Sequence, residues 1–187
     1  MNSFLPQNYE PPKSSSNYMK FDQGENRFRV VSKKPIIGYE YWTPDNKPVR
    51  VRQMPKEMPS DLRRAKGRED EHWMNSVKHF WAFAVYNFKD QRVQVLEITQ
   101  TSIQNGLTAL FKNEDWGHPS QYDISITREG EGMETRYSVM PNPHKKMTSE
   151  IEQAVKDTPV RLEALYDGGD PFDTANDTPN DTSINDF

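Results

Sequence analysis

The chain contains no cysteine, which excludes disulfides, thiolate metal sites and cysteine nucleophiles and fits a reducing compartment. It also lacks an apolar run close to the roughly 20 residues that a membrane-spanning helix needs. Its first residues show no signal-peptide pattern. We therefore expect a cytoplasmic protein without contact with a membrane.

Sequence motifs of the common enzyme classes are missing as well. There is no phosphate-binding glycine loop, no G-x-S-x-G elbow and no H-E-x-x-H motif. His72 and His79 are seven residues apart, and no spacing with His118 or His144 reproduces a zinc pattern. Consecutive acidic residues such as Glu69–Glu71 are typical of a solvated loop. We expect a protein that is not an enzyme and holds no metal or cofactor.

Basic residues are absent from the segment 167–187, which carries six aspartates. Such a segment buries too little apolar surface to offset its ordering entropy, so we expect a disordered, partner-binding tail. The whole chain has 24 basic and 28 acidic residues. Without the six tail aspartates the balance is 24 against 22, a net charge of +2 for residues 1–166. A polyanionic ligand is compatible with this body.

The remaining chain suits one domain of roughly 130 to 140 residues. Residues 1–20 are rich in Pro, Ser and Asn and predict an irregular N-terminal arm. We place the domain at 21–146, with a mobile basic loop at 53–72, and a possible helix within 147–166 that runs from Thr148 to Lys156.

Alternating apolar and polar residues predict strands around 26–30, 36–42 and 49–52. The aromatic run 80–86 and the run 93–98 predict a central hairpin. Ile103, Leu107, Leu110 and Phe111 have helical spacing, weakened by Gly106. Strands at 122–127 and 135–139 follow, joined by a glycine turn. This order predicts a mainly β fold, a five-stranded OB-type barrel with a short helix between its strand units.

Single-strand binding needs cations that follow phosphates and aromatic faces on which bases stack. Both occur on the predicted strands and loop. The predicted DNA-binding residues are Arg27, Arg29, Trp42, Arg50, Arg52, Arg63, Arg64, Lys66, Arg68, Trp73, Lys78, Phe80, Trp81, Phe83 and Tyr86. Aromatic residues on a central strand are more often core than ligand platform. About half of the set 80–86 must fill the core, and the sequence leaves open which face does so.

Several stretches resemble the single-stranded DNA-binding proteins of bacteriophages. They are Glu25–Val30, Gly38–Trp42, Lys78–Phe83, Leu96–Gln100, Glu114–Gly117 and Tyr122–Ile124. The resemblance covers roughly residues 21–141, and for a phage-encoded protein it implies the host cell cytoplasm. It implies an OB-fold core that coats single strands in replication, recombination and repair. It also implies that an acidic tail binds a polymerase, helicase or primase.

The tail residues expected to bind such partners are Asp181, Ile184, Asp186 and Phe187. Some phage members carry a structural zinc held by cysteine and histidine, which this chain, without cysteine, lacks. The number of nucleotides covered, self-association on DNA and the choice between DNA and RNA stay open. Two other functions also stay open, a DNA-mimicking adaptor and a metal-dependent enzyme that uses the loop carboxylates.

Overall fold

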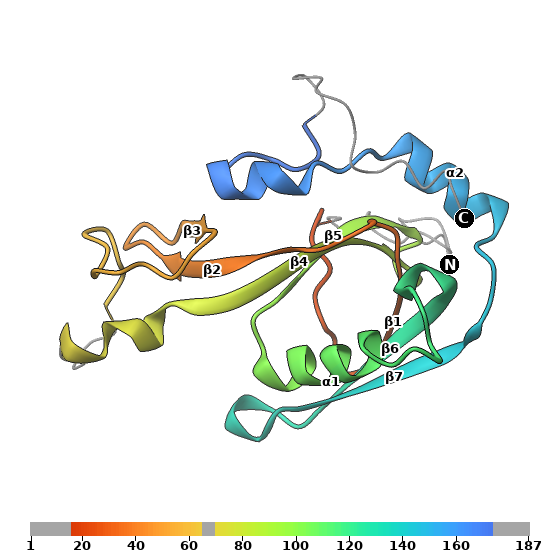
Figure 1. Ribbon diagram of the computed structural model, residues 1–187, viewed down its shortest axis with the longest axis horizontal. Coiled ribbons are helices and arrows are strands. Elements are labelled where there is room, and N and C mark those ends of the chain that lie inside the picture. Colours follow the sequence, from red (N-terminus) through yellow and green to blue (C-terminus); the bar gives the residue numbers. More distant parts are fainter. Residues whose placement is uncertain (1–15, 65–69, 174–187) are drawn as a thin grey trace, which may run out of the picture.

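A computed structural model describes residues 16–64 and 70–173 and shows a mainly β protein (Figure 1). The seven strands are β1 (Gly24–Val30), β2 (Ile36–Trp42), β3 (Pro48–Val51), β4 (Lys78–Asn87), β5 (Arg92–Ile98), β6 (Tyr122–Glu129) and β7 (Arg136–His144). The α-helices are α1 (Thr101–Phe111) and α2 (Ser149–Asp157). Short 3₁₀ helices are η1 (Asp70–Ser76), η2 (Pro119–Gln121), η3 (Gly132–Glu134) and η4 (Leu162–Asp167). Within the described ranges, no helix combines the length and apolar character required to span a membrane.

The strands form one antiparallel sheet in the order β3-β2-β4-β1-β6-β7, and β5 also pairs with β4. The predicted order of strands, helix and closing hairpin is confirmed. The prediction of a closed five-stranded barrel is wrong, because the sheet has seven strands and no ladder joins β5 to β7 in the described residues. Alternation of apolar and polar residues indicates where the strands lie along the chain. It does not indicate whether the two edge strands of a sheet pair with one another to close a barrel.

Strand β4 connects two parts of the molecule. Its residues 78–82 pair with β2, and its residues 85–87 pair with β1. The strands β2 and β3 and the first half of β4 therefore project from the body as an arm, residues 36–64 and 70–82 (Figure 1). Part of the segment predicted as a loop at 53–72 packs on this arm, where Leu62, Tyr41 and Val77 are buried together.

The N-terminal segment lies along the edge of β5 that faces β7. The Met19 N–H donates to the Val95 carbonyl at 2.9 Å, and the Val95 N–H donates to the Asn17 carbonyl at 2.9 Å. Met19 is buried in the core, and Phe21 packs against Tyr137 of β7 with ring centroids 5.8 Å apart. Of the predicted irregular arm, residues 16–20 are thus part of the folded body, and residues 1–15 lie outside the described ranges.

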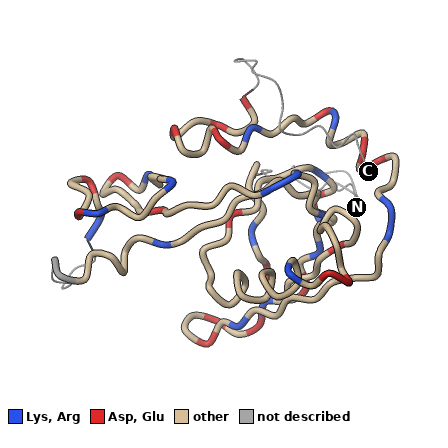
Figure 2. Tube along the Cα trace, in the orientation of Figure 1, with Lys and Arg blue, Asp and Glu red and all other residues tan. Residues whose placement is uncertain are grey.

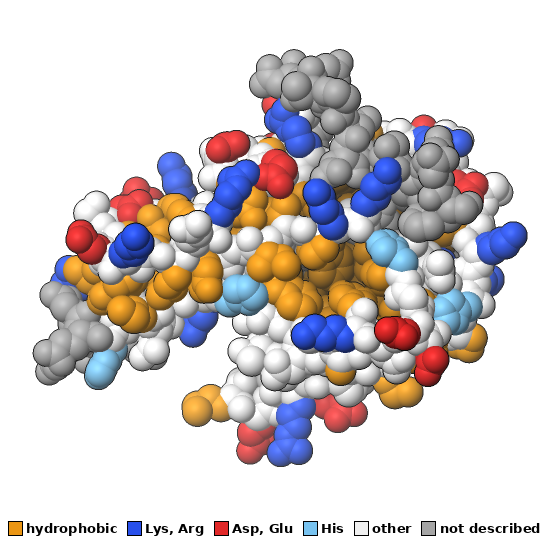
Figure 3. Space-filling view, viewed as in Figure 1, with side chains coloured by type: hydrophobic (Ala, Val, Ile, Leu, Met, Phe, Trp, Pro, Cys, Tyr) orange, Lys and Arg blue, Asp and Glu red, His pale blue; other side chains and the backbone are white. Residues whose placement is uncertain are grey.

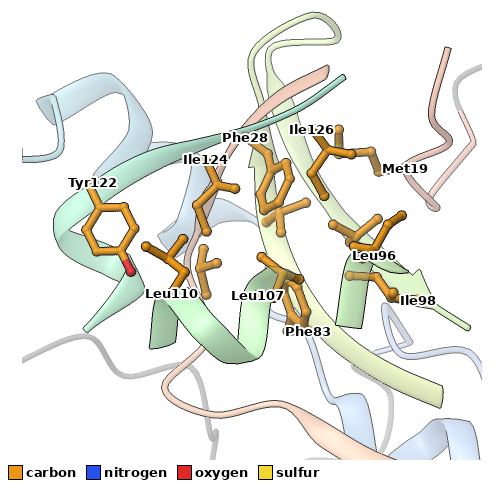
Figure 4. Packing of buried hydrophobic residues seen from close by; sticks show 13 residues of the cluster. Met19, Phe28, Phe83, Leu96, Ile98, Leu107, Leu110, Tyr122, Ile124 and Ile126 are labelled. Carbon is orange, nitrogen blue, oxygen red and sulfur yellow. The ribbon is translucent and has the colours of Figure 1, made fainter. Parts of the chain in front are cut away.

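Both faces of β4 are buried, which is why the alternation of residues could not show which face fills the core. Phe83 and Val85 face α1 and pack with Phe28, Leu96 and Leu107 (Figure 4). On the other face, Ala82, Ala84 and Tyr86 of β4 pack beneath α2 and η4, whose buried residues are Ile151, Val155, Ala164 and Leu165. Helix α2 begins one residue after its predicted start, and the Thr148 side chain caps it by accepting from the Ile151 N–H.

Candidate nucleic-acid interface

Arg27 and Arg29, which were predicted to contact phosphates, share one buried carboxylate. The Arg29 Nε donates to Asp123 Oδ1 at 2.6 Å, and Arg27 binds the other oxygen of Asp123. Arg29 is only 1% exposed. It also donates to the carbonyls of Ser120 and Lys145, at 3.0 and 2.8 Å. Arg29 therefore bonds only to groups inside the protein in this structure, which corrects the prediction that it contacts phosphates. The Arg27 side chain, in contrast, remains 43% exposed.

Arg50 is buried between two carboxylates on the face of the sheet that η4 covers. Its guanidinium lies 3.0 Å from Glu40 and 2.7 Å from Glu97. Burial raises the pKa of Glu40, and the charge of Arg50 only partly opposes this shift. A guanidinium held by two carboxylates is not available to a phosphate, so the prediction for Arg50 does not hold in this structure either.

Arg52 remains exposed but has partners from the C-terminal part of the chain. It forms an ion pair with Glu163 at 2.5 Å, and its guanidinium lies 4.1 Å from the ring centroid of Tyr166. The Tyr166 hydroxyl donates to the Ile37 carbonyl at 2.8 Å. These contacts attach η4 to the arm.

The predicted loop cations have varied surroundings. Arg63 is exposed and donates to the Asn46 side chain at 2.5 Å, and Arg64 is exposed as well. Lys78 is exposed on the same face of the sheet as Glu40, its partner in the β2–β4 register. Lys66 and Arg68 lie outside the described residues, as do the tail residues Asp181, Ile184, Asp186 and Phe187.

The predicted aromatic residues divide into core and surface. Phe80, Phe83 and Tyr86 are 0%, 2% and 5% exposed, so these are the members of the set 80–86 that fill the core, and their faces are not open to bases in this structure. Trp42 is 40% exposed. Trp81 and Trp73 are half-buried. Because alternate residues point to opposite faces, Trp42 and Trp81 lie on opposite sides of the arm.

The side of the arm with Trp81 carries a continuous line of rings, which we call the aromatic row: Tyr39, His79 and Trp81. Tyr39 is the register partner of His79, and Ile37 is that of Trp81. Ring centroids are 5.4 Å apart for Tyr39 and His79 and 6.5 Å apart for His79 and Trp81, both in edge-to-face geometry. His79 is exposed, and Ile37 beside the row is 49% exposed.

Helix α1 fixes the position of the aromatic row. The Gln104 side-chain amide donates to the carbonyls of His79 and Ile98, each at 3.0 Å. The Gln104 carbonyl oxygen lies 3.5 Å from His79 Nδ1. Within the described part of the chain, the buried indole N–H of Trp81 has no acceptor. An unpaired buried donor costs about 1–3 kcal/mol, so this N–H lowers the stability of the fold.

A second group of exposed cations comes from two other segments of the chain. Figure 2 shows Lys and Arg at the turn between β1 and β2 and in the segment that leads into α2. We call the four exposed lysines of these segments, Lys33, Lys34, Lys145 and Lys146, the lysine strip. Among the described residues, none of the four forms an ion pair.

Two buried or half-buried residues bring the two halves of the lysine strip toward one another. His118 Nε2 lies 3.0 Å from the Lys33 carbonyl, and its Nδ1 lies 2.8 Å from the Ser120 hydroxyl. Arg29 then joins Ser120 to Lys145 through their carbonyls. Figure 3 shows hydrophobic side chains gathered in a hollow between the arm and α1, with Lys, Arg and His side chains around it.

The sequence contains weak signals for the residues that were not predicted. Tyr39 and His79 occupy alternate positions with Ile37 and Trp81, but only the cross-strand register brings them together. The strip appears as two Lys-Lys pairs in segments next to proline, Lys34 before Pro35 and Lys145 shortly after Pro143. In the described ranges, no group of three or more His, Asp or Glu side chains is arranged to hold a metal ion.

Comparison of the chain with protein-family models, with characterised proteins and with solved structures gives no match.

Proposed function

We propose that this protein binds single-stranded DNA without sequence preference, as a coating protein in phage DNA replication, recombination and repair. The observation that carries this proposal is the aromatic row, three rings on one side of the arm with an exposed His79 in the middle. Aromatic faces in a surface groove are what unpaired bases stack on, and stacking tolerates any sequence because every base has a π-face.

Gln104 holds His79 from the backbone side, which keeps the row in place in the absence of a ligand.

The topology supports a relation to the OB type. Strands β1, β4 and β5 form a meander-like group, α1 follows, and β6 and β7 return to the other edge of β1. We propose that the body is an OB-type fold opened between β5 and β7, where α1 and residues 17–21 occupy the gap. The arm is then an insertion that extends the binding surface. The acidic tail is proposed to recruit replication enzymes.

A fluorescence titration tests the proposal. An unlabelled oligothymidine of about 30 nucleotides should quench the intrinsic tryptophan emission, and salt should weaken the binding. Trp81→Phe should remove most of the quenching while an aromatic face remains. Trp42→Phe, on the opposite side of the arm, should leave the quenching nearly unchanged.

Affinity provides a second readout. Loss of one stacking ring costs about 1–3 kcal/mol, so His79→Ala or Tyr39→Leu should weaken binding roughly 5- to 150-fold. Trp42→Leu is the control, because it removes an aromatic side chain from the other side of the arm. Absence of binding to the unaltered protein at low salt would refute the proposed function and favour a protein-interaction adaptor.

A further inference from the structure

We infer that the lysine strip is a phosphate-binding extension of the aromatic row, so that one DNA strand runs from Tyr39 and Trp81 across the β1–β2 turn toward Lys145. This inference rests on the proposed function and adds a path for the backbone. Its first support is continuity along the chain. Lys34 precedes Ile37, the register partner of Trp81, by three residues, a span of at most about 11 Å.

The second support is that the lysines of the strip form no ion pairs, unlike several of the arginines. Arg29, Arg50 and Arg52 each pair with carboxylates from distant segments. The lysines of the strip have no such partner among the described residues and are exposed. A phosphate that approaches them therefore displaces only water and counterions, whereas a phosphate at Arg50 would have to displace two carboxylates.

The third support is that the protein fixes the two halves of the strip together. Arg29 is almost fully buried, and its Nη1 donates to both the Ser120 and the Lys145 carbonyls. The His118 ring connects Lys33 to Ser120. These hydrogen bonds fix the backbone at Lys33 and Lys145, while the lysine side chains can adjust to a phosphate. Arg29 and His118 are thus positioning residues, and the lysines are the contacts.

Salt dependence measures this directly. For single strands the slope of log K against log salt is about −0.7 for each phosphate contact. The double variants K33A/K34A and K145A/K146A should each reduce the magnitude of the slope by about 1.4. At 0.1 M salt each contact contributes a factor of about 5, so each double variant should bind a 30-nucleotide oligothymidine roughly 25-fold more weakly.

Length dependence separates the strip from the row. An oligothymidine of about 5 nucleotides can occupy the row alone, so at least one of the two double variants should bind it nearly as well as the unaltered protein does. The control variant K20A/K156A removes the same charge from exposed positions elsewhere. Thermal unfolding should show equal stability for all three variants, because every altered side chain is exposed.

The outcomes separate the two proposals. If the unaltered protein binds and His79→Ala weakens binding, but both strip variants keep the salt slope of K20A/K156A, the path over the strip is refuted and the proposed function stands. If the unaltered protein fails to bind, the proposed function fails first. Slopes reduced by about 1.4 in both strip variants, and unchanged in the control, would establish the path.

Discussion

Gly106 of α1 faces Val139 of β7 so closely that a Cβ atom on Gly106 would lie 2.8 Å from Val139 Cγ2. A glycine in the middle of a helix lowers its intrinsic stability by about 1 kcal/mol relative to alanine. The contact with Val139 explains why glycine is nevertheless present. The helix approaches β7, which has no strand partner on this edge within the described residues.

Gly106→Ala should therefore lower the free energy of unfolding by about 1–3 kcal/mol, in spite of the better helix propensity of alanine. Urea unfolding followed by circular dichroism measures the change. In the double variant with Val139→Ala, the added methyl group has room, so the two effects should be strongly non-additive. A Gly106→Ala protein more stable than the original would show that α1 does not lie this close to β7.

The ion pairs of Arg50 predict a large loss of stability when Arg50 is replaced and a small one when Glu40 is replaced. Arg50→Met leaves the buried Glu40 and the half-buried Glu97 without a cation and should cost about 3–5 kcal/mol. Glu40→Gln keeps the pair of Arg50 with Glu97 and should be nearly neutral. A large loss in Glu40→Gln would show that the Glu40 carboxylate stabilises the fold.

The same pair predicts a pH dependence. Burial raises the pKa of Glu40 above its usual value of 4.5, so the folded state binds the proton more tightly than the unfolded state. Stability should consequently fall as pH rises from about 4.5 through the raised pKa of Glu40. Urea titrations at several pH values should show a smaller fall for Glu40→Gln than for the unaltered protein. Parallel curves for the two proteins would contradict the assignment.

Tyr122 has its hydroxyl inside the core, where it points toward Leu110 (Figure 4). The hydroxyl is buried and has no hydrogen-bond partner among the described residues, and burial raises its pKa. Tyr122→Phe removes an unsatisfied polar group without changing the ring, so it should raise stability by up to about 1–2 kcal/mol. Thermal unfolding tests this, and a clear loss of stability would show that the hydroxyl has a partner in solution.

Met19 tests whether the N-terminal segment belongs to the fold. It is 6% exposed and belongs to the core cluster that includes Phe28 and Leu96. Met19→Ala should cost about 2–3 kcal/mol in urea unfolding, in the range of buried methionine truncations. Lys20→Ala changes the exposed neighbour and should have little effect. Equal stabilities of the two variants would mean that residues 17–19 do not pair with β5 in solution.

Local sequence patterns were sufficient to predict most of the secondary structure. The predicted strand at 36–42 is β2, and the helix around Ile103 and Leu107 is α1. Alternation and helical spacing are properties of neighbouring residues, so they are visible in one chain. The open edge between β5 and β7 depends on Met19 pairing with Val95, a contact between residues far apart in the sequence.

The candidate site was harder to predict for a related reason. The arginines of β1, and Arg50 and Arg52 in and just after β3, alternate as an exposed basic face would, but they have carboxylate partners that are distant in sequence. Arg29 pairs with Asp123, Arg50 with Glu97 and Arg52 with Glu163. The residues next to an arginine in the sequence thus do not show whether it binds a phosphate or pairs with a carboxylate of the protein. Trp81 was among the predicted residues, while Tyr39 and His79 became visible only through the register.

The continuity of β4 has a consequence for the cost of binding. Trp81 and Ala82 belong at once to the ladder with β2 and to the ladder with β5, so the arm cannot swing relative to the body without breaking hydrogen bonds on both sides. The rings of the aromatic row are therefore preorganised. Binding of a nucleic-acid strand to these rings would restrict few protein torsions. The loss of conformational entropy on association would therefore fall mainly on the flexible nucleic acid.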